Sequence, residues 1–160
     1  MALVRILVDG DGLLQQWQEL APGKPRFSEA AREELMNHLT QYFDISETPL
    51  TTIFDGSHVE VPEDDLVPDA DGDENVTLLY TRPGQTPVQM IHRILPRMRS
   101  QGDFLVVTDG QLDRANLEPY GGQLCSCANF IQMVKKAHDD MEREIQQLNQ
   151  IENKKFTFHG

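Results

Sequence analysis

The chain has 160 residues, of which 39% are hydrophobic and 25% are charged, and its formal charge is −12. This size predicts one domain with a sizeable core, and the acidity excludes a generally basic nucleic-acid binder. No apolar run approaches the roughly 20 residues that span a bilayer, so we expect neither a membrane segment nor a signal peptide. Two cysteines, Cys125 and Cys127, are too few for a disulfide framework or a zinc site. We therefore expect a reduced, cytoplasmic protein, with bacteria as its source.

The negative charge is concentrated in residues 56–75. This segment holds eight of the 26 acidic residues and no lysine or arginine, which leaves 18 acids against 14 bases elsewhere. Its run DADGDE (69–74) lacks the spacing and the distal Glu of an EF-hand calcium loop. We predict a solvated loop between two strands.

Apolar runs alternate with helical patterns along the chain. In chain order we predict a strand at 3–8, a helix at 28–43, strands at 50–54 and 76–80, a helix at 86–100, a strand at 104–108, a short strand at 123–125 and a long polar helix at 128–152. Continuous apolar strands that alternate with helices indicate a parallel sheet covered on both faces. If Cys125 and Cys127 both lay on the last strand, they would share one of its faces.

Capping residues mark the starts of the first two predicted helices. Ser28 can cap the helix at 28–43. Thr86, Pro87 and Gln89 form a capping box with proline at the first helical position. Pro96 should kink the second helix or end it early.

Three predicted strands end in an Asp-Gly pair, with the acids Asp9, Asp55 and Asp109. The carboxyl ends of parallel strands meet at one edge of a sheet, where ligands bind. Carboxylates that lie close together raise one another's pKa or require a cation, and Mg²⁺ or Mn²⁺ suits such hard oxygen ligands. Asp11 follows the first strand closely and is a further candidate ligand. Since Asp-Gly is also ordinary turn chemistry, the pattern alone leaves both a functional site and plain turns open.

The ordered set of segments resembles the YacP-like NYN domains, a branch of the PIN-like nucleases. The resemblance runs from residue 6 to about residue 136. It is carried by ILVDGDGLLQQW (6–17), SEAAREELMNHLTQY (28–42), TTIFDG (51–56), VTLLYTRPGQTPVQMI (76–91), FLVVTDGQLDR (104–114) and GGQLCSCANFIQMV (121–134). It implies a three-layer α/β/α PIN-like fold with a central, mainly parallel sheet of four to five strands. We expect residues 1–135 to form this domain and residues 136–160 a C-terminal helix and tail, packed on it or extending from it.

The resemblance also implies a metal-dependent ribonuclease site. Asp9, Asp55 and Asp109 would be the catalytic residues and would bind Mg²⁺ or Mn²⁺, with Asp11 as an additional ligand. The chain departs from the family at its acidic motifs, however. The D-G-Y-N motif reads DGDG (9–12), E-T-A-D reads QTPV (85–88), and T-S-D reads TDG (108–110). Gln85 is at best a neutral ligand and Val88 cannot bind a cation, so metal affinity should fall.

Two functions fit this pattern. The protein is either a weak metal-dependent endoribonuclease that acts on single-stranded RNA or a degenerate pseudonuclease that binds RNA, the ribosome or a protein partner. Arg82, Arg93 and Lys135 are candidate contacts to an RNA backbone, although solvated helix faces also explain them.

Two alternatives come from other classes. DGDG from Asp9 looks like the D-x-D-G opening of haloacid dehalogenase-type phosphatases, in which the first Asp attacks phosphate. The Lys and acid pair that should follow, Lys135 with the acids at 139 and 140, fall inside a predicted helix. A non-catalytic interaction module would instead use the C-terminal helix to meet a partner or a second copy, through apolar positions such as Ile145, Leu148 and Ile151.

Overall fold

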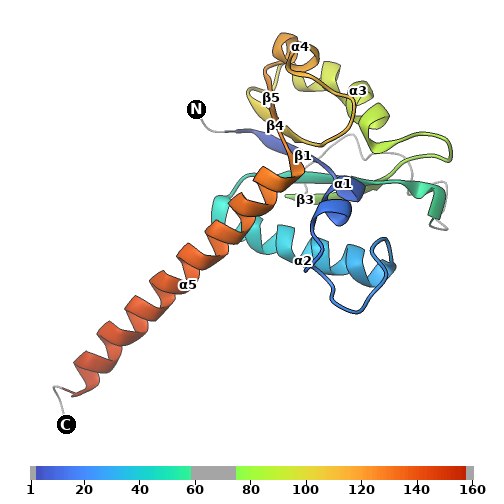
Figure 1. Cartoon of the computed structure of the whole chain (residues 1–160). Coiled ribbons are helices and arrows are strands. Elements are labelled where there is room, and N and C mark those ends of the chain that lie inside the picture. The colour runs from blue at the N-terminus through green and yellow to red at the C-terminus, as the bar shows by residue number, and fades with distance from the viewer. Residues whose placement is uncertain (1–2, 59–74, 158–160) are drawn as a thin grey trace.

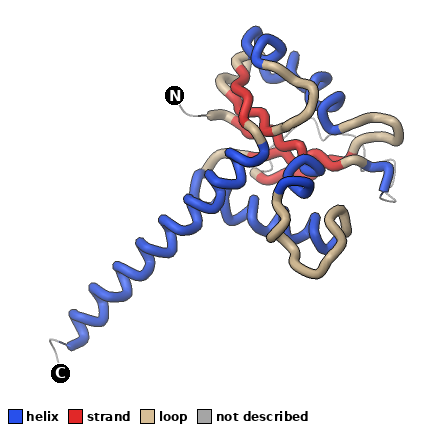
Figure 2. Tube along the Cα trace, viewed as in Figure 1, coloured by secondary structure: helices blue, strands red, loops and turns tan. Residues whose placement is uncertain are grey.

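A five-stranded parallel sheet forms the centre of the fold in the computed structural model, which describes residues 3–58 and 75–157 (Figures 1 and 2). The strands lie in the order β3-β2-β1-β4-β5, and the four pairings are parallel. Their bounds are β1 Arg5–Asp9, β2 Leu50–Phe54, β3 Val76–Tyr80, β4 Phe104–Val107 and β5 Gly122–Cys125. The predicted strands are confirmed, with the last one included.

Helices cover both faces of the sheet (Figure 1). On one face lie α1 (Gly10–Gln16), α2 (Glu29–Ser46) and α5 (Cys127–Thr157), and on the other lie α3 (Pro87–Met98), α4 (Arg114–Leu117) and the short turn η3 (Glu118–Tyr120). Successive strand residues alternate between the two cores. In β1, Ile6 and Val8 pack toward α2 and α5, whereas Leu7 packs toward α3. The predicted three-layer α/β/α fold is therefore confirmed.

The predicted caps form as their residue types suggest. Ser28 Oγ accepts a hydrogen bond from the backbone N–H of Ala31 at 3.2 Å. Thr86 and Gln89 form a reciprocal capping box at the start of α3. Pro96 lies inside α3, which ends two residues later at Met98.

Helix α1 was not among the predicted elements. It begins directly after β1, at a sequence whose two glycines are typical of a turn. Gly10 is required by a close approach, because a Cβ there would lie 2.5 Å from Phe54 Cε1.

The condition under which the two cysteines would share a strand face is not met. Cys125 ends β5, whereas Cys127 begins α5 and is fully buried. The chain turns from strand to helix between them, so the alternation of a strand does not relate their side chains.

Helix α5 packs on the sheet layer with its first turns and then projects away from the domain (Figure 1). Val134 is fully buried, whereas Ile145, Leu148 and Ile151 are 49%, 61% and 51% exposed. The boundary expected after residue 135 falls inside this one continuous helix. No helix in the described ranges is long and apolar enough to cross a membrane. Of the predicted acidic loop, residues 59–74 lie outside the described residues, and Gly56–His58 forms the short turn η1.

Three aromatic rings join the end of α1 to α2 and α5. The ring centroid of His38 lies 5.0 Å from that of Trp17 and 5.7 Å from that of His138. Burial lowers the pKa of His38, and the neighbouring His138 adds to this effect, whereas Glu34, 3.3 Å from His38 Nε2, opposes it. The net effect favours the neutral imidazole in the folded protein.

We predict that the unfolding temperature falls when the pH is lowered from about 7.5 to about 5.5. Because the pKa of His38 is lower in the folded state, the unfolded chain binds the proton more readily, and stability is lost as the pH falls through the unfolded value. Thermal unfolding followed by circular dichroism checks this. His38→Gln should flatten the pH dependence, and His92→Gln, on the exposed face of α3, should leave it unchanged. Equal slopes in the wild type and His38→Gln would contradict the prediction.

Candidate functional site

The carboxyl edge of the sheet gathers the four predicted aspartates. Asp9 ends β1, Asp55 follows β2, and Asp109 lies just beyond β4. Since β2 and β4 flank β1, the three strand ends are neighbours. Asp11 joins them from the first turn of α1, which starts at the same edge.

Asp9 is the most enclosed of these carboxylates, with 8% of the residue exposed. Its Oδ1 accepts a hydrogen bond from the backbone N–H of Gly12 at 3.0 Å, and its Oδ2 accepts one from Thr108 Oγ1 at 2.8 Å. Burial raises the pKa of Asp9, the two hydrogen bonds oppose this, and the nearby charge of Asp109 raises it further. Asp9 therefore caps α1 and ties β1 to the end of β4.

The other three carboxylates also hold backbone amides. Asp11 Oδ2 accepts from the N–H of Asp55 at 2.7 Å, and Asp55 Oδ1 accepts from the N–H of Ser57 at 2.9 Å. Asp109 Oδ1 accepts from the N–H of Cys127 at 3.0 Å, at the start of α5. The acids thus form two linked pairs, Asp11 with Asp55 and Asp9 with Asp109.

Cys127 lies against the second pair, and the sequence analysis did not assign it to the site. A Cβ on Gly12 would be 3.0 Å from both Cys127 Sγ and Asp9 Oδ2, so the thiol and the carboxylate share one small space. Burial raises the pKa of Cys127 to about 12, together with the charges of Asp109 and Asp9 and a hydrogen bond to Asp109. The group stays a thiol at neutral pH, which lets it lie beside two carboxylates without adding a charge.

Val88 closes the site from the α3 side. A Cβ on Gly110 would lie 2.5 Å from Val88 Cγ2 and 3.2 Å from Thr108 Oγ1. The isopropyl group of Val88 therefore packs against the residues just after β4. The NYN resemblance aligns position 88 with an acid. Gln85 lies in the loop before α3, where its backbone N–H donates to the carbonyl of Arg82 at 3.0 Å.

These donors do not fit a resident Mg²⁺ or Mn²⁺ centre. Across residues 3–58 and 75–157, no three His, Cys, Asp or Glu side chains are placed to hold a metal ion together. Both oxygens of Asp9 are engaged by protein donors, and each of the other three acids holds an amide. Mg²⁺ demands near-ideal octahedral oxygen ligation, which carboxylates turned toward backbone amides supply poorly.

The predicted basic contacts lie on two sides of the sheet. Arg82 precedes α3 and Arg93 lies on its exposed face, both in the layer with α4. Lys135 lies on α5 in the opposite layer, and its Nζ is 3.1 Å from Glu19 Oε2. The structure therefore brings Arg82 and Arg93 into one layer and leaves Lys135 apart from them.

The sequence matches the YacP-like NYN domain family over residues 6–158. The chain belongs to this family. The fold is similar to a crystal structure of Rae1 (YacP) from Bacillus subtilis, with a TM-score of 0.68 at 17% identity over 92% of this chain and 82% of that chain. A mutant form of the same protein gives a TM-score of 0.70 at 18% identity over 91% and 82%. No curated protein matches the sequence.

A NYN domain is related to the PIN-like ribonucleases, so the protein is ribonuclease-related in fold and family. The phosphatase alternative has no support, since the family is a different one and Lys135 lies on α5, paired with Glu19. The match includes all of α5, so the projecting helix belongs to the family's sequence range.

We predict that Cys127 resists a thiol reagent in the folded protein. Its high pKa leaves little thiolate, the form that reacts. The variant Cys125→Ser isolates Cys127, and its labelling by an aromatic disulfide should be at least about 100-fold slower in the native than in the unfolded state. Asp109→Asn in the same background removes the adjacent charge and should speed the native reaction. Equal rates in the native and unfolded states would contradict this account.

Proposed function

We propose that this NYN domain is a pseudonuclease that binds single-stranded RNA without hydrolysing it. The observation that carries the proposal is the state of Asp9, whose two oxygens are both held by Gly12 and Thr108. Val88 supports it from the opposite side, since an apolar group occupies the position of a family acid. The carboxylates then stabilise the fold, and the surface around them remains for binding.

The proposal follows from what hydrolysis requires. A metal ion in such a site holds the phosphodiester, activates a water and stabilises the leaving oxygen. Each lost carboxylate removes one negative charge that would attract the cation, and Gln85 and Val88 remove two. Burial raises the pKa of Asp9, but the same burial encloses the carboxyl group and keeps it from a substrate.

RNA binding is supported by the family and by the exposed cations of the α3 layer. Arg82 and Arg93 are exposed, and guanidinium groups suit phosphate contacts. With a formal charge of −12 the protein repels RNA at long range, so binding depends on such local contacts and weakens steeply with salt.

A metal-dependent endoribonuclease is the second candidate. It is favoured by the gathering of Asp9, Asp11, Asp55 and Asp109 at one edge, where the family resemblance expects an Mg²⁺ or Mn²⁺ site. Either function leaves room for a further partner. The exposed residues Ile145, Leu148 and Ile151 of α5 would contact a ribosomal surface, another protein or a second copy, and this contact stays a prediction.

RNA binding and cleavage can be separated in one assay. We predict that a labelled single-stranded RNA binds in EDTA and in Mn²⁺, as followed by anisotropy, and stays intact on a denaturing gel. Asp9→Asn should leave the affinity unchanged. Arg82→Gln with Arg93→Gln should weaken binding and lower the salt slope by about two, one for each lost phosphate contact.

Arg143→Gln, on the projecting part of α5, is the control for lost charge and should bind as the wild type does. Cleavage that needs Mn²⁺ and disappears in Asp9→Asn would establish the endoribonuclease instead. Absence of any RNA binding would overturn both candidates.

Restoring the acids tests the explanation for lost metal binding. We predict that Gln85→Glu with Val88→Asp creates Mn²⁺ binding that the wild type lacks, because two carboxylates return at positions that the family resemblance aligns with acids. Val88→Asn, with Gln85 unchanged, is the matched control, since Asn and Gln have the sizes of Asp and Glu without their charges. Calorimetry measures the binding. No gain in the double variant would show that the substitutions at 85 and 88 are not the cause.

A further inference from the structure

We propose that a pocket between α1 and α2 binds one nucleotide of the RNA, with the base on its apolar floor, the phosphate at Arg26, and Lys24 as a second cation on the opposite rim. The inference rests on the proposed function and names a binding subsite for it. The pocket has a volume of about 360 Å³, within the roughly 300–1,000 Å³ of typical ligand sites. It lies apart from the four aspartates, none of which lines it.

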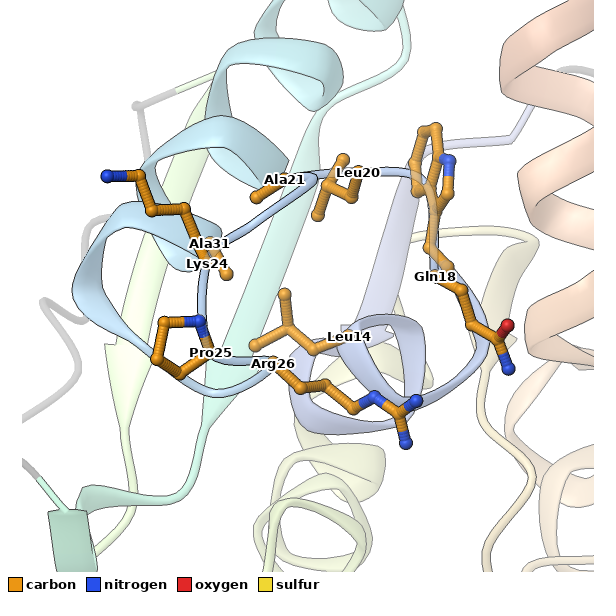
Figure 3. Close-up of a pocket in the computed structure, with 9 residues that line it drawn as sticks. Leu14, Gln18, Leu20, Ala21, Lys24, Pro25, Arg26 and Ala31 are labelled. Carbon is orange, nitrogen blue, oxygen red and sulfur yellow. The ribbon is translucent and has the colours of Figure 1, made fainter.

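The floor of the pocket is apolar and already formed. Leu14 of α1, Leu20 of the connecting loop and Ala31 of α2 are 2%, 7% and 3% exposed. Figure 3 shows Leu14 pointing into the middle of the pocket. Pro25 adds a rigid wall, and its carbonyl accepts a hydrogen bond from Ser28 Oγ at 2.7 Å, which fixes the loop to the start of α2. A preformed site loses little entropy on binding.

Trp17 supplies an aromatic group to the same lining. Its ring is held by His38, 5.0 Å away between centroids. Only 7% of Trp17 is exposed, and it belongs to the hydrophobic core. The indole therefore supports the apolar floor from behind and lies close enough to report on a ligand that binds there.

Polar groups at the rim indicate an anion. Lys24 and Arg26 have no ion pair with any residue of the described ranges, although the chain carries 26 acidic residues. In Figure 3 the side chains of Gln18 and Arg26 extend toward the same side of the pocket, and Lys24 points to the other side. The amide of Gln18 can both donate to and accept from a base edge. An apolar floor with an amide and a guanidinium on one rim fits a base that carries a phosphate.

The position of the pocket fits an RNA that crosses the carboxyl edge. A helix that joins parallel strands runs back across the sheet, so α2 begins near the carboxyl ends of the strands. Helix α1 begins there as well, capped by Asp9. The pocket therefore lies between two helices that both begin at the edge of the sheet that carries the aspartates.

Trp17 is the only tryptophan, so its indole N–H gives one signal in a ¹H–¹⁵N spectrum of the full chain. Titration with uridine 5′-monophosphate or adenosine 5′-monophosphate should shift this signal saturably. Uridine or adenosine alone should bind several-fold more weakly, and inorganic phosphate alone should not shift the signal. Arg26→Gln with Lys24→Gln should weaken monophosphate binding at least about fivefold, while Arg143→Gln should leave it unchanged.

A second variant tests the floor without changing charge. Ala31→Met fills the pocket and should abolish the saturable shift, and thermal unfolding shows whether the variant is folded. No saturable shift in the wild type, or equal affinity in the wild type and the Arg26→Gln/Lys24→Gln variant, would overturn the proposal. An acidic peptide that shifts the signal when neither nucleotide does would overturn it too.

Failure of the pocket and failure of the proposed function are distinguishable. If the pocket variants bind single-stranded RNA as tightly as the wild type in the anisotropy assay, the nucleotide subsite is wrong and RNA binding stands. If the wild type binds no RNA, the proposed function fails whatever the mononucleotide titration gives.

Discussion

The buried carboxylate of Asp9 is the interaction on which this end of the molecule depends. It accepts one hydrogen bond from Gly12 in α1 and one from Thr108, 99 residues away beyond β4. Without it, the start of α1 would lose its cap, and β1 would lose the side-chain hydrogen bond to Thr108 that supplements its backbone pairing with β4. Asp109, which follows the neighbouring strand β4, acts in a similar way, because its Oδ1 accepts a hydrogen bond from the backbone N–H of Cys127 at the start of α5. In a nuclease these carboxylates would face a metal ion. In this protein they hold the ends of helices and strands together.

Under the proposed function, this arrangement accounts for a fold that persists without catalysis. A carboxylate that caps a helix stabilises the protein with or without a cation, so Asp9 remains useful after its partners disappear. The protonated thiol of Cys127 and the isopropyl group of Val88 fill space beside it without adding charge. The proposed RNA contacts, at the cations near α3 and in the α1–α2 pocket, do not include the four aspartates, so the binding that we propose does not require the acids.

Much of the fold could be predicted from the sequence, because it is encoded locally. The strands at 50–54 and 76–80 match β2 and β3, and Ser28 and Thr86 cap as their residue types suggest. The edge that holds the four aspartates followed from parallel strands ending in Asp-Gly. The long-range features did not follow: α1 depends on the contact of Gly10 with Phe54, and the pocket combines two helices and a loop. Such contacts join residues that are far apart in the sequence, and the local sequence around each one does not predict the other.

Calorimetric titration of Mn²⁺ into the wild type, Asp9→Asn and Asp55→Asn tests the central claim most directly, because it measures what the carboxylates do without assuming a substrate. The account predicts that the wild type shows no saturable binding at about millimolar metal, and that neither variant differs from it. Saturable binding in the wild type that both variants lose would contradict the account, since the four aspartates would then form a metal centre.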